Sequence, residues 1–422
     1  MKKIRFFAAL ILVVAMLAGC SSSDSSTGTG SSSSEKKNIT VWMPDKVAEL
    51  TQTKINEWLS GQTDWKDKFT VTVTALGEDD AATQLLTDVE AAADVFGFTQ
   101  DSLSRLVAAG GLSKVNGVFK DHVTANNDAA SVNAVTLNGE IYAYPETSDN
   151  GFFLYYDKSV VTDTSSLDSI ISQCSSKGKS FYMDIQNGWY DVAFFFATGA
   201  DCSYEYNAEG QLLGCTCDFN SDNGLKAMKA MISLAEKRGK GYEQVPDGGA
   251  AVLFNPNGGT AGAIVSGTWD YATVKEYLGS NFGASKMPTM NVDGKDYQMS
   301  GFSGFKLVGV KPQTDSDKVT FCHLLADFIT SEEMQLARFE QNGWGPSNKN
   351  AQNSDKVEEN EALAALADQL QYCKAQGQYP AAFWDLLKAF GTDINSGKYA
   401  GADDATLRAA LKELEDSLKA AK

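Results

Sequence analysis

Asn38-Ile-Thr-Val-Trp-Met43 is an apolar run with the length of one buried strand, and the pattern around it decides the fold. Val47 to Leu59 has the spacing of an amphipathic helix, Phe69-Thr-Val-Thr-Val-Thr74 alternates with period two, and Asp80 to Ala93 is again helical in spacing. Asp94-Val-Phe-Gly-Phe98 is a further short apolar strand. Strands that alternate with helices predict a mainly parallel sheet covered on both faces.

A second set of strands follows a polar interruption. Ile141-Tyr-Ala-Tyr-Pro145 and Gly151-Phe-Phe-Leu-Tyr-Tyr156 flank residues 146–150, which could be a hinge crossing. Of the 422 residues, roughly 385 remain for folding once a signal and tether are set aside, which is more than one core usually serves. We therefore expect two α/β lobes. Later in the chain, Phe305 to Val310 reads as a strand and Val319 to Phe339 as one helix.

The amino terminus has the pattern of a lipoprotein signal. Basic residues at 2–5 precede an apolar run from Phe6 to Leu17, which is too short to cross a bilayer as a permanent helix. Small residues then lead to Cys20, and residues 21–34 are almost entirely Ser, Gly and Thr, a composition that forms flexible tethers. The sequence predicts a globular body on the extracellular face of the cell membrane, anchored through lipid on Cys20.

The charge balance narrows the range of partners. The formal net charge is −18, and loss of Lys2, Lys3 and Arg5 with the signal makes it −21. An acidic surface of this kind repels nucleic acid and anionic lipid. No second apolar run has the length of a membrane span, so anchoring would depend on lipid alone.

Seven cysteines become six once Cys20 is assigned to lipid. The segment from Asp201 to Cys217 reads as two strands around a turn, with Cys202 facing either Cys215 or Cys217. An even number of cysteines outside the cytoplasm favours a hairpin disulfide, and free thiols are the alternative. Half of a metal site at Cys215-Thr-Cys217 is disfavoured, because no histidine lies nearby and the spacing is shorter than in structural zinc sites.

Catalytic motifs are scarce. The sequence has no phosphate-cradling loop, dinucleotide fingerprint or His-Glu-x-x-His motif, and His122 and His323 have no clustered nucleophile. We therefore predict no cofactor, no metal and no catalytic residues. Paired carboxylates could still carry out glycoside hydrolysis, and sequence spacing does not exclude it.

Aromatic and polar residues gather in the loops after strands. A sugar ring has apolar faces and a rim of hydroxyls, so flat aromatic rings with carboxylate or amide acceptors suit it. The alternative for any one tryptophan is a place in the core. The candidate set comprises Trp42 to Lys46, Phe98 to Asp101, Asp149, Asn187 to Tyr190, Trp269, Phe302, Trp344 and Trp384.

With these segments in order, the chain resembles the extracellular solute-binding proteins of sugar ABC importers, in particular the maltose- and maltodextrin-binding branch. The resemblance covers nearly the whole mature chain. It is carried by Ile39-Thr-Val-Trp42, Ala93-Asp-Val-Phe-Gly-Phe98, Asn138-Gly-Glu-Ile-Tyr-Ala-Tyr-Pro145 with Tyr155-Tyr-Asp-Lys158, Ala263-Ile-Val-Ser-Gly-Thr-Trp269, Asn342-Gly-Trp-Gly-Pro-Ser347 and Ala382-Phe-Trp384.

The resemblance implies a periplasmic-binding-protein-like fold, with two α/β lobes joined by crossing segments and a ligand cleft between them. It places the signal peptide at 1–19, the lipidated cysteine and tether at 20–37, lobe I at 38–147 and 303–343, and lobe II at 148–302 and 344–422.

Several ligand contacts follow from the resemblance in the first half of the chain. Asp45 and Lys46 would bind one end of the sugar, although they could also simply start a helix. Phe98 would stack on a ring and Asp101 would accept from hydroxyls, with a helix-capping role as the alternative for Asp101. Asp149 would bind hydroxyls from the first crossing segment.

The second half of the chain departs from the family pattern in places. Asn187 stands where a carboxylate is common and Trp189 where a tyrosine is common, which leaves the sugar open. Trp269 is the strongest stacking candidate, because Gly267 would let the chain turn and project the indole. On the helix that follows Pro380, Asp385 stands where the family has a tyrosine. Lys388 stands where the family has an arginine, and a lysine would bind the sugar more loosely than an arginine does. The remaining candidates are Phe302, Trp384, and Trp344 as a cleft-rim or lobe-packing residue.

The sequence therefore predicts a monomeric, lipid-anchored receptor, not an enzyme, that captures an oligosaccharide of the maltose or maltodextrin class and delivers it to membrane permease subunits. One alternative is a secreted, lipid-anchored glycoside hydrolase that uses Asp101 or Asp149. Another is a receptor or sensor for a different sugar, and a third is a surface adhesin or sensor lipoprotein that has no transport partner.

Overall fold

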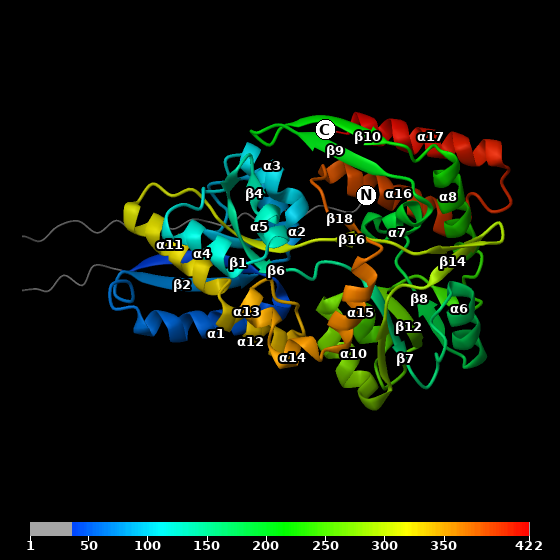
Figure 1. The fold of residues 1–422 in the computed structure, drawn as a ribbon, viewed down its shortest axis with the longest axis horizontal. Helices are drawn as coiled ribbons and strands as arrows, with labels where there is room; N and C mark the ends of the chain where they lie inside the picture. The colour runs from blue at the N-terminus through cyan, green and yellow to red at the C-terminus, as the bar shows by residue number, and fades with distance from the viewer. Residues whose placement is uncertain (1–35, 422) are drawn as a thin grey trace, which may run out of the picture. The chain divides into compact units, whose positions relative to one another are not determined.

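The computed structural model describes residues 36–421. Its first sheet has the strand order β2-β1-β3-β17-β6 (Figure 1). The strands are β1 Lys37–Met43, β2 Phe69–Ala75, β3 Val95–Thr99, β6 Ala143–Thr147 and β17 Lys306–Val310. β1 is parallel to β2 and β3, as the alternation of strands and helices predicts, whereas β17 is antiparallel to both β3 and β6. The start of β17 therefore lies at the sheet edge where β3 ends.

Amphipathic helices cover this first sheet. α1 Asp45–Gly61 buries Val47, Thr51 and Ile55, which are spaced four residues apart and share one helix face. Together with the sheet they enclose a core that includes Ile39, Val41 and Phe96. The other helices of this lobe are α2 Glu78–Thr87, α3 Leu103–Ala108, α4 Val118–Asn126, α5 Ala129–Ala134, α11 Ser316–Ile329 and α12 Glu332–Asn342.

The single helix expected over 319–339 is wrong. α11 ends at Ile329 and α12 begins at Glu332. Ser331 separates them, since its hydroxyl accepts a hydrogen bond from the Met334 N–H and caps α12. The apolar spacing continues through the break, which is why the sequence pattern alone joins the two helices.

The second sheet has the order β11-β8-β12-β7-β13. Its strands are β7 Phe153–Asp157, β8 Ser180–Tyr182, β11 Tyr242–Glu243, β12 Ala261–Ser266 and β13 Phe282–Ser285. β12 is parallel to β8 and antiparallel to β7. All six residues of β12 are buried, in keeping with its continuous apolar sequence.

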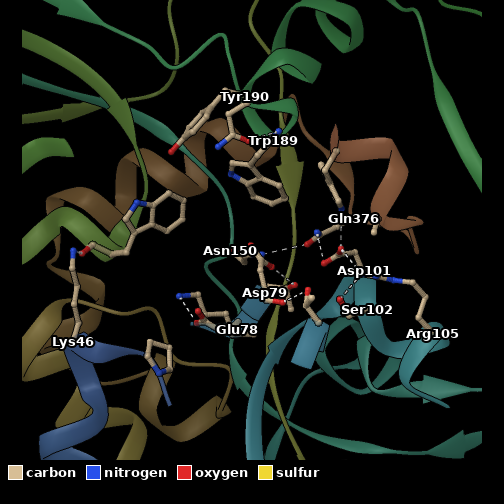
Figure 2. A pocket seen from close by; sticks show the side chains of 18 of the residues that line it. Lys46, Glu78, Asp79, Asp101, Ser102, Arg105, Asn150, Trp189, Tyr190 and Gln376 are labelled. Atoms are coloured by element: carbon tan, nitrogen blue, oxygen red, sulfur yellow. Dashed lines mark hydrogen bonds and ion pairs between the residues drawn. The ribbon is translucent and has the colours of Figure 1, made fainter. Parts of the chain in front are cut away.

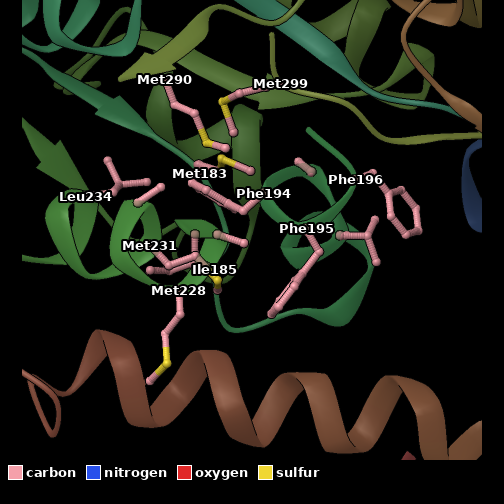
Figure 3. Close-up of a cluster of buried hydrophobic side chains, with 14 of the residues drawn as sticks. Met183, Ile185, Phe194, Phe195, Phe196, Met228, Met231, Leu234, Met290 and Met299 are labelled. Carbon is pink, nitrogen blue, oxygen red and sulfur yellow. The ribbon is translucent and has the colours of Figure 1, made fainter. Parts of the chain in front are cut away.

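The second core is rich in phenylalanine and methionine (Figure 3). Phe194 and Phe195 on α7 are fully buried, as are Met228 and Met231 on α8. The helices of this lobe are α6 Leu167–Ser176, α7 Gly188–Thr198, α8 Asp222–Ala235, α9 Gly249–Leu253, α10 Tyr271–Leu278, α15 Glu361–Leu370, α16 Ala381–Asn395 and α17 Asp404–Ala420. The shorter elements are β4 Thr136–Leu137, β5 Glu140–Ile141, β14 Thr289–Val292, β15 Lys295–Gln298, α13 Lys349–Gln352, α14 Asp355–Glu358 and the 3₁₀ turns Gln100–Ser102, Thr268–Asp270 and Gly279–Asn281.

Several segments pass between the two sheets and are hydrogen bonded to one another. The polar stretch 146–150 includes the last two residues of β6 and begins the connection from β6 of the first sheet to β7 of the second. Its Ser148 N–H donates to the Gly345 carbonyl at 3.1 Å, and its Asn150 N–H donates to the Gly304 carbonyl at 3.2 Å. β16 Phe302–Ser303 pairs with β18 Lys374–Ala375 in the same region. The lobe boundaries given above stay predictions.

The cysteine-containing segment forms the expected hairpin, with β9 Cys202–Tyr206 antiparallel to β10 Leu212–Cys217. Cys202 lies opposite Cys217 in register, and the Cys202 Sγ lies 3.7 Å from the Cys215 Sγ. The cysteines of residues 36–421 are free thiols in this structure, so the hairpin disulfide stays a prediction. The hairpin reaches α3 of the first lobe (Figure 1). Gly210 at its tip, with φ of +79°, lies so close that an added Cβ would be 2.1 Å from the Ser104 carbonyl oxygen.

The signal peptide, Cys20 and most of the tether lie outside the described residues. Across residues 36–421, none of the helices combines the length and the apolar composition needed to span a bilayer.

Candidate functional site

A cavity of about 790 Å³ is lined by residues of both lobes (Figure 2). From the first lobe and the crossing segments come Pro44, Asp45, Lys46, Glu78, Asp79, Thr83, Thr99, Asp101, Ser102, Arg105, Asn150, Lys306, Trp344 and Gln376. From the second lobe come Asn187, Trp189, Tyr190, Trp269, Ala381, Trp384 and Asp385. The size suits a ligand of several rings.

The first-lobe wall of the cavity follows from the sheet topology. Asp45 comes directly after β1, Glu78 and Asp79 come after β2, and Asp101 comes after β3. Because these three strands are parallel, their carboxyl ends meet at one edge of the sheet, where open α/β sheets bind ligands. The structure thus brings the predicted Asp45, Lys46 and Asp101 together.

The second-lobe wall carries most of the aromatic rings. Trp189 and Trp384 lie with ring centroids 6.0 Å apart at an interplanar angle of 52°. Asn187 caps α7, since its side-chain oxygen accepts from the Trp189 N–H at 3.0 Å, and this fixes the start of the helix that carries Trp189. Figure 2 shows the Trp189 ring on the side of the cavity that faces the labelled carboxylates of the first lobe.

Trp269 reaches the cavity for a different local reason from the one expected. Gly267 has φ of −114°, an ordinary extended conformation, so the turn itself does not require glycine. The indole of Trp269 instead folds back over Gly267, where an added Cβ would be 2.2 Å from the ring. Gly267 therefore provides space for the indole.

Lys46 connects the two lobes. Its Nζ donates to the Trp269 carbonyl and lies 3.0 Å from Asp270 Oδ1. This contact lies beside the cavity and joins the end of β1 to the turn after β12.

Asp101 is the most deeply buried of the predicted polar contacts, with 4% exposure. It accepts hydrogen bonds from Trp384 Nε1 and Gln376 Nε2, both at 3.3 Å, and the Arg105 guanidinium lies 3.9 Å away. The helix-capping alternative does not hold, because the described start of α3 has no side-chain cap. Burial raises the pKa of Asp101, although the Thr99 hydroxyl, the Arg105 charge and the Trp384 N–H oppose the shift.

Four charged residues of the cavity are not part of the sequence-based prediction: Glu78, Asp79, Arg105 and Lys306. Glu78 and Asp79 begin α2, and Lys306 begins β17 with its Nζ 3.0 Å from Glu78 Oε1. Desolvation within the cavity, followed by the nearby Asp101 and Glu78 carboxylates, raises the pKa of Asp79 to about 6. Two features of the sequence could have indicated these residues. One is an acidic run directly after a strand, and the other is a lysine at the start of an apolar strand.

Trp344 fulfils both of its predicted alternatives. It is 3% exposed and packs in the first core, yet its ring also lines the cavity. Lys306 Nζ lies 3.9 Å from the ring centroid, which is cation–π distance.

The structure does not bring four of the predicted contacts to the cavity. Phe98 is fully buried in the middle of the first sheet, where it pairs with Leu307 and packs against Phe96. Phe302 is fully buried behind Trp189 and Trp384, with centroids at 5.4 and 6.0 Å.

The other two are polar. Asp149 is 3% exposed, and one of its oxygens accepts from the Thr268 hydroxyl and the Gly345 N–H, so it holds crossing segments together. Lys388 lies one turn after Trp384 on α16 and is exposed to solvent away from the cavity wall. From α16, the cavity is lined by Ala381, Trp384 and Asp385.

Among residues 36–421, histidine, cysteine and carboxylate side chains do not form a group of three or more that could hold a metal ion. The cavity offers instead aromatic faces, carboxylate acceptors and amide groups such as Asn150 and Gln376. Groups of this kind can hold a neutral polar ligand by stacking and hydrogen bonding.

Two α/β sheets, hydrogen-bonded crossing segments and one cavity walled by both lobes define a two-lobed binding protein. The model of the bacterial extracellular solute-binding protein family matches residues 61–365, and the chain belongs to this family. The family expectation from the sequence is confirmed.

Solved structures agree with this assignment. One solved with acarbose has 28% identity and a TM-score of 0.79, covering 92% of this chain and 99% of that one. The maltodextrin-binding protein MalE1 from L. casei BL23, without ligand, has 24% identity and a TM-score of 0.72, with 92% and 100% coverage. The maltose-maltodextrin binding protein of Alicyclobacillus acidocaldarius has 19% identity and a TM-score of 0.73, with 90% and 100% coverage. The last two show the fold alone. No relative is found among curated protein sequences.

Proposed function

We propose that this protein is the substrate-binding subunit of a carbohydrate ABC importer and captures an oligosaccharide of the maltodextrin class without altering it. The observation that carries the proposal is one cavity in which three tryptophans of the second lobe, Trp189, Trp269 and Trp384, line the wall opposite the carboxylates of the first lobe, with Trp344 on the first-lobe side. Sugar rings stack on such faces through their C–H groups while their hydroxyls donate to the carboxylates.

The free energies that such contacts contribute are large enough for the protein to bind a sugar at micromolar concentration. Micromolar binding corresponds to about −8 kcal/mol. Stacked aromatic contacts contribute about 0.5 to 1.5 kcal/mol each beyond the area that they bury, and net hydrogen bonds contribute a similar amount. Three or four rings with several hydroxyl contacts supply this after the ordering costs of association.

A bound ligand should favour closure of the two lobes, because both lobes contribute residues to the cavity wall. Asp101 belongs to the first lobe and Trp384 to the second, and they already share a hydrogen bond. A sugar that contacts both walls binds the closed arrangement more tightly than the open one, and it shifts the population by that difference.

The similar protein solved with acarbose supports the substrate class, since acarbose is an oligosaccharide mimic and that chain is matched over nearly its full length. We extend the proposal to lipid anchoring at Cys20, a monomeric state and delivery to membrane permease subunits. The lipoprotein pattern of residues 1–20 and the family membership support these points.

Calorimetric titration tests the ligand class. We expect maltotriose, maltotetraose and acarbose to bind, whereas lactose and cellotriose should give little heat. If none of the glucans binds but another sugar does, the substrate class is wrong while the receptor role stands.

A second measurement separates capture from hydrolysis. Prolonged incubation of the protein with maltotetraose should leave the number of reducing ends unchanged. Turnover that disappears in an Asp101→Asn variant would support the glycoside hydrolase alternative and overturn the receptor proposal.

A further inference from the structure

Lys306 is a buried lysine on the floor of the cavity. It is 7% exposed and begins β17, where it pairs with Thr99 at the end of β3. Because β17 is antiparallel to β3, its first residue lies at the ligand-binding edge of the sheet. Its Nζ lies 3.0 Å from Glu78 Oε1, 3.9 Å from the Trp344 ring centroid and 5.9 Å from the Trp269 ring centroid.

The ammonium is charged despite its burial. Burial lowers the pKa of Lys306, but the carboxylates of Glu78, Asp149 and Glu146 outweigh it and raise the pKa above its ordinary value. A buried lysine is normally paired, and Glu78 is the carboxylate within ion-pair distance. The positive charge is therefore a permanent part of the cavity floor at neutral pH.

The ammonium has donor capacity beyond this pair. A lysine head carries three N–H donors and no acceptor. Glu78 occupies one direction and the face of Trp344 attracts the ammonium from another. Since Lys306 also lines the cavity, donor capacity remains for an occupant.

We propose that Lys306 is a specificity-determining residue that donates a hydrogen bond to an oxygen of a saccharide unit that stacks on Trp269. The inference rests on the proposed function and assigns a subsite within it. Hydroxyl and ring oxygens accept from an ammonium, whereas a cationic amine in the same position would be repelled. The subsite at Lys306 therefore excludes a cationic unit and suits a neutral one, since Glu78 already balances the lysine charge.

The part of the cavity around Asp101 has the opposite preference, because the Asp101 and Asp79 carboxylates lie near each other there and Arg105 is the nearby cation. An amine-bearing unit, such as the one in acarbose, would bind at Asp101, and the two subsites together orient the ligand.

The test is titration of Lys306→Met with maltotetraose and with acarbose. The methionine keeps the length of the stem against Trp344 but removes the charge. We expect at least a tenfold loss of affinity for both ligands, because both place a neutral unit at this subsite. Lys306→Arg should recover part of the loss, since it keeps a cationic donor.

Two control variants distinguish a loss of ligand binding from a loss of folding. Lys311→Met removes a lysine just beyond the other end of the same strand and should leave affinity unchanged. The double variant Glu78→Gln with Lys306→Met restores charge balance, so it tests the loss of affinity even if the single variant unfolds.

The melting temperature without ligand gives the decisive comparison. A lysine that only balances buried carboxylates would lower the melting temperature of Lys306→Met and leave the affinity of the folded protein at the wild-type value, which would overturn the inference. Wild-type protein that binds neither saccharide would overturn the proposed function itself.

Discussion

Asp101 and Asp149 are almost equally buried, at 4% and 3% exposure, yet they belong to different regions with different tasks. Asp101 lies on the cavity wall and accepts from Trp384 and Gln376, two side chains that also line the cavity. Asp149 lies in the crossing region and accepts from the Thr268 hydroxyl and a backbone N–H of Gly345. Burial and residue type do not distinguish a ligand contact from a hinge contact, whereas the identity of the donors does.

The most deeply buried ion pair of the described residues joins the end of β6, where the chain enters the crossing region, to α12 of the first lobe. Arg338 and Glu146 are 1% exposed each, with Arg338 Nε 3.2 Å from Glu146 Oε1. Arg338 Nη1 also donates to the Ile329 carbonyl at 2.9 Å. The comparison predicts that changes in the crossing region cost stability and that changes on the cavity wall cost affinity.

The largest effect is expected for Arg338→Met, which leaves the Glu146 carboxylate buried without its partner. The free energy of unfolding should fall by about 3 to 5 kcal/mol, as is usual when one member of a buried pair is removed. Urea denaturation measures the change. Glu146→Gln added to Arg338→Met should restore most of the loss, and a double variant as unstable as the single one would contradict this reasoning.

Trp269→Ala should have the largest effect on the cavity side. Loss of one stacking face should cost about 2 kcal/mol of binding free energy, or roughly thirtyfold in affinity for maltotetraose. The ring is half-buried beside the cavity, so the melting temperature of the free protein should change little. Equal losses in affinity and stability would place Trp269 among the core residues.

The direct comparison uses one conservative substitution at each aspartate. Asp149→Asn should destabilise the protein by about 1 to 3 kcal/mol, because an amide serves the two donors less well than a carboxylate. Asp101→Asn should weaken oligosaccharide binding about tenfold without loss of stability, since burial already raises the pKa of Asp101 and disfavours its charged form. Thermal melts and calorimetry on both variants measure the two effects, and the reverse assignment would break the distinction.

The smallest effect concerns pH. The pKa of Asp79 is raised to about 6 from 3.8, so the folded state binds this proton more readily than the unfolded state does. The group therefore adds stability below pH 4, and that stability is lost as pH rises through 6. Because Asp79 is exposed to solvent in the cavity, screening should keep the effect below about 1 kcal/mol.

Asp79→Asn measures this effect. The variant should be slightly more stable than wild type at pH 7, and the difference in melting temperature should vanish by pH 4. A difference that is constant across this range would assign the stabilisation to something other than Asp79 ionisation.

The sequence was informative where periodicity and strand order determine position. Strands β1, β2 and β3 and the residues after them follow from the alternation of apolar runs, so the places of Asp45 and Asp101 could be predicted. Trp269 was also predictable, although through the wrong role for Gly267. The buried positions of Phe98 and Phe302 were not, because an aromatic ring near a strand end has the same local pattern whether it faces the cavity or the core.

The missed residues depend on tertiary structure. Lys306 reaches the cavity only because β17 is antiparallel to its neighbours, which a pattern of parallel strands does not indicate. Gln376 and Asn150 come from crossing segments whose pairing joins distant parts of the chain. Asp149 was misplaced for the same reason, since its donors lie more than a hundred residues away in sequence.

The close contact between Gly210 and α3 affects how the two lobes can separate. The hairpin belongs to the second lobe and its tip rests against the backbone of the first, so separation of the lobes has to lift it from the helix. Leu213 beside that tip is 66% exposed. A fluorescent dye attached at position 213 would report each opening of the receptor from a point outside the ligand chamber.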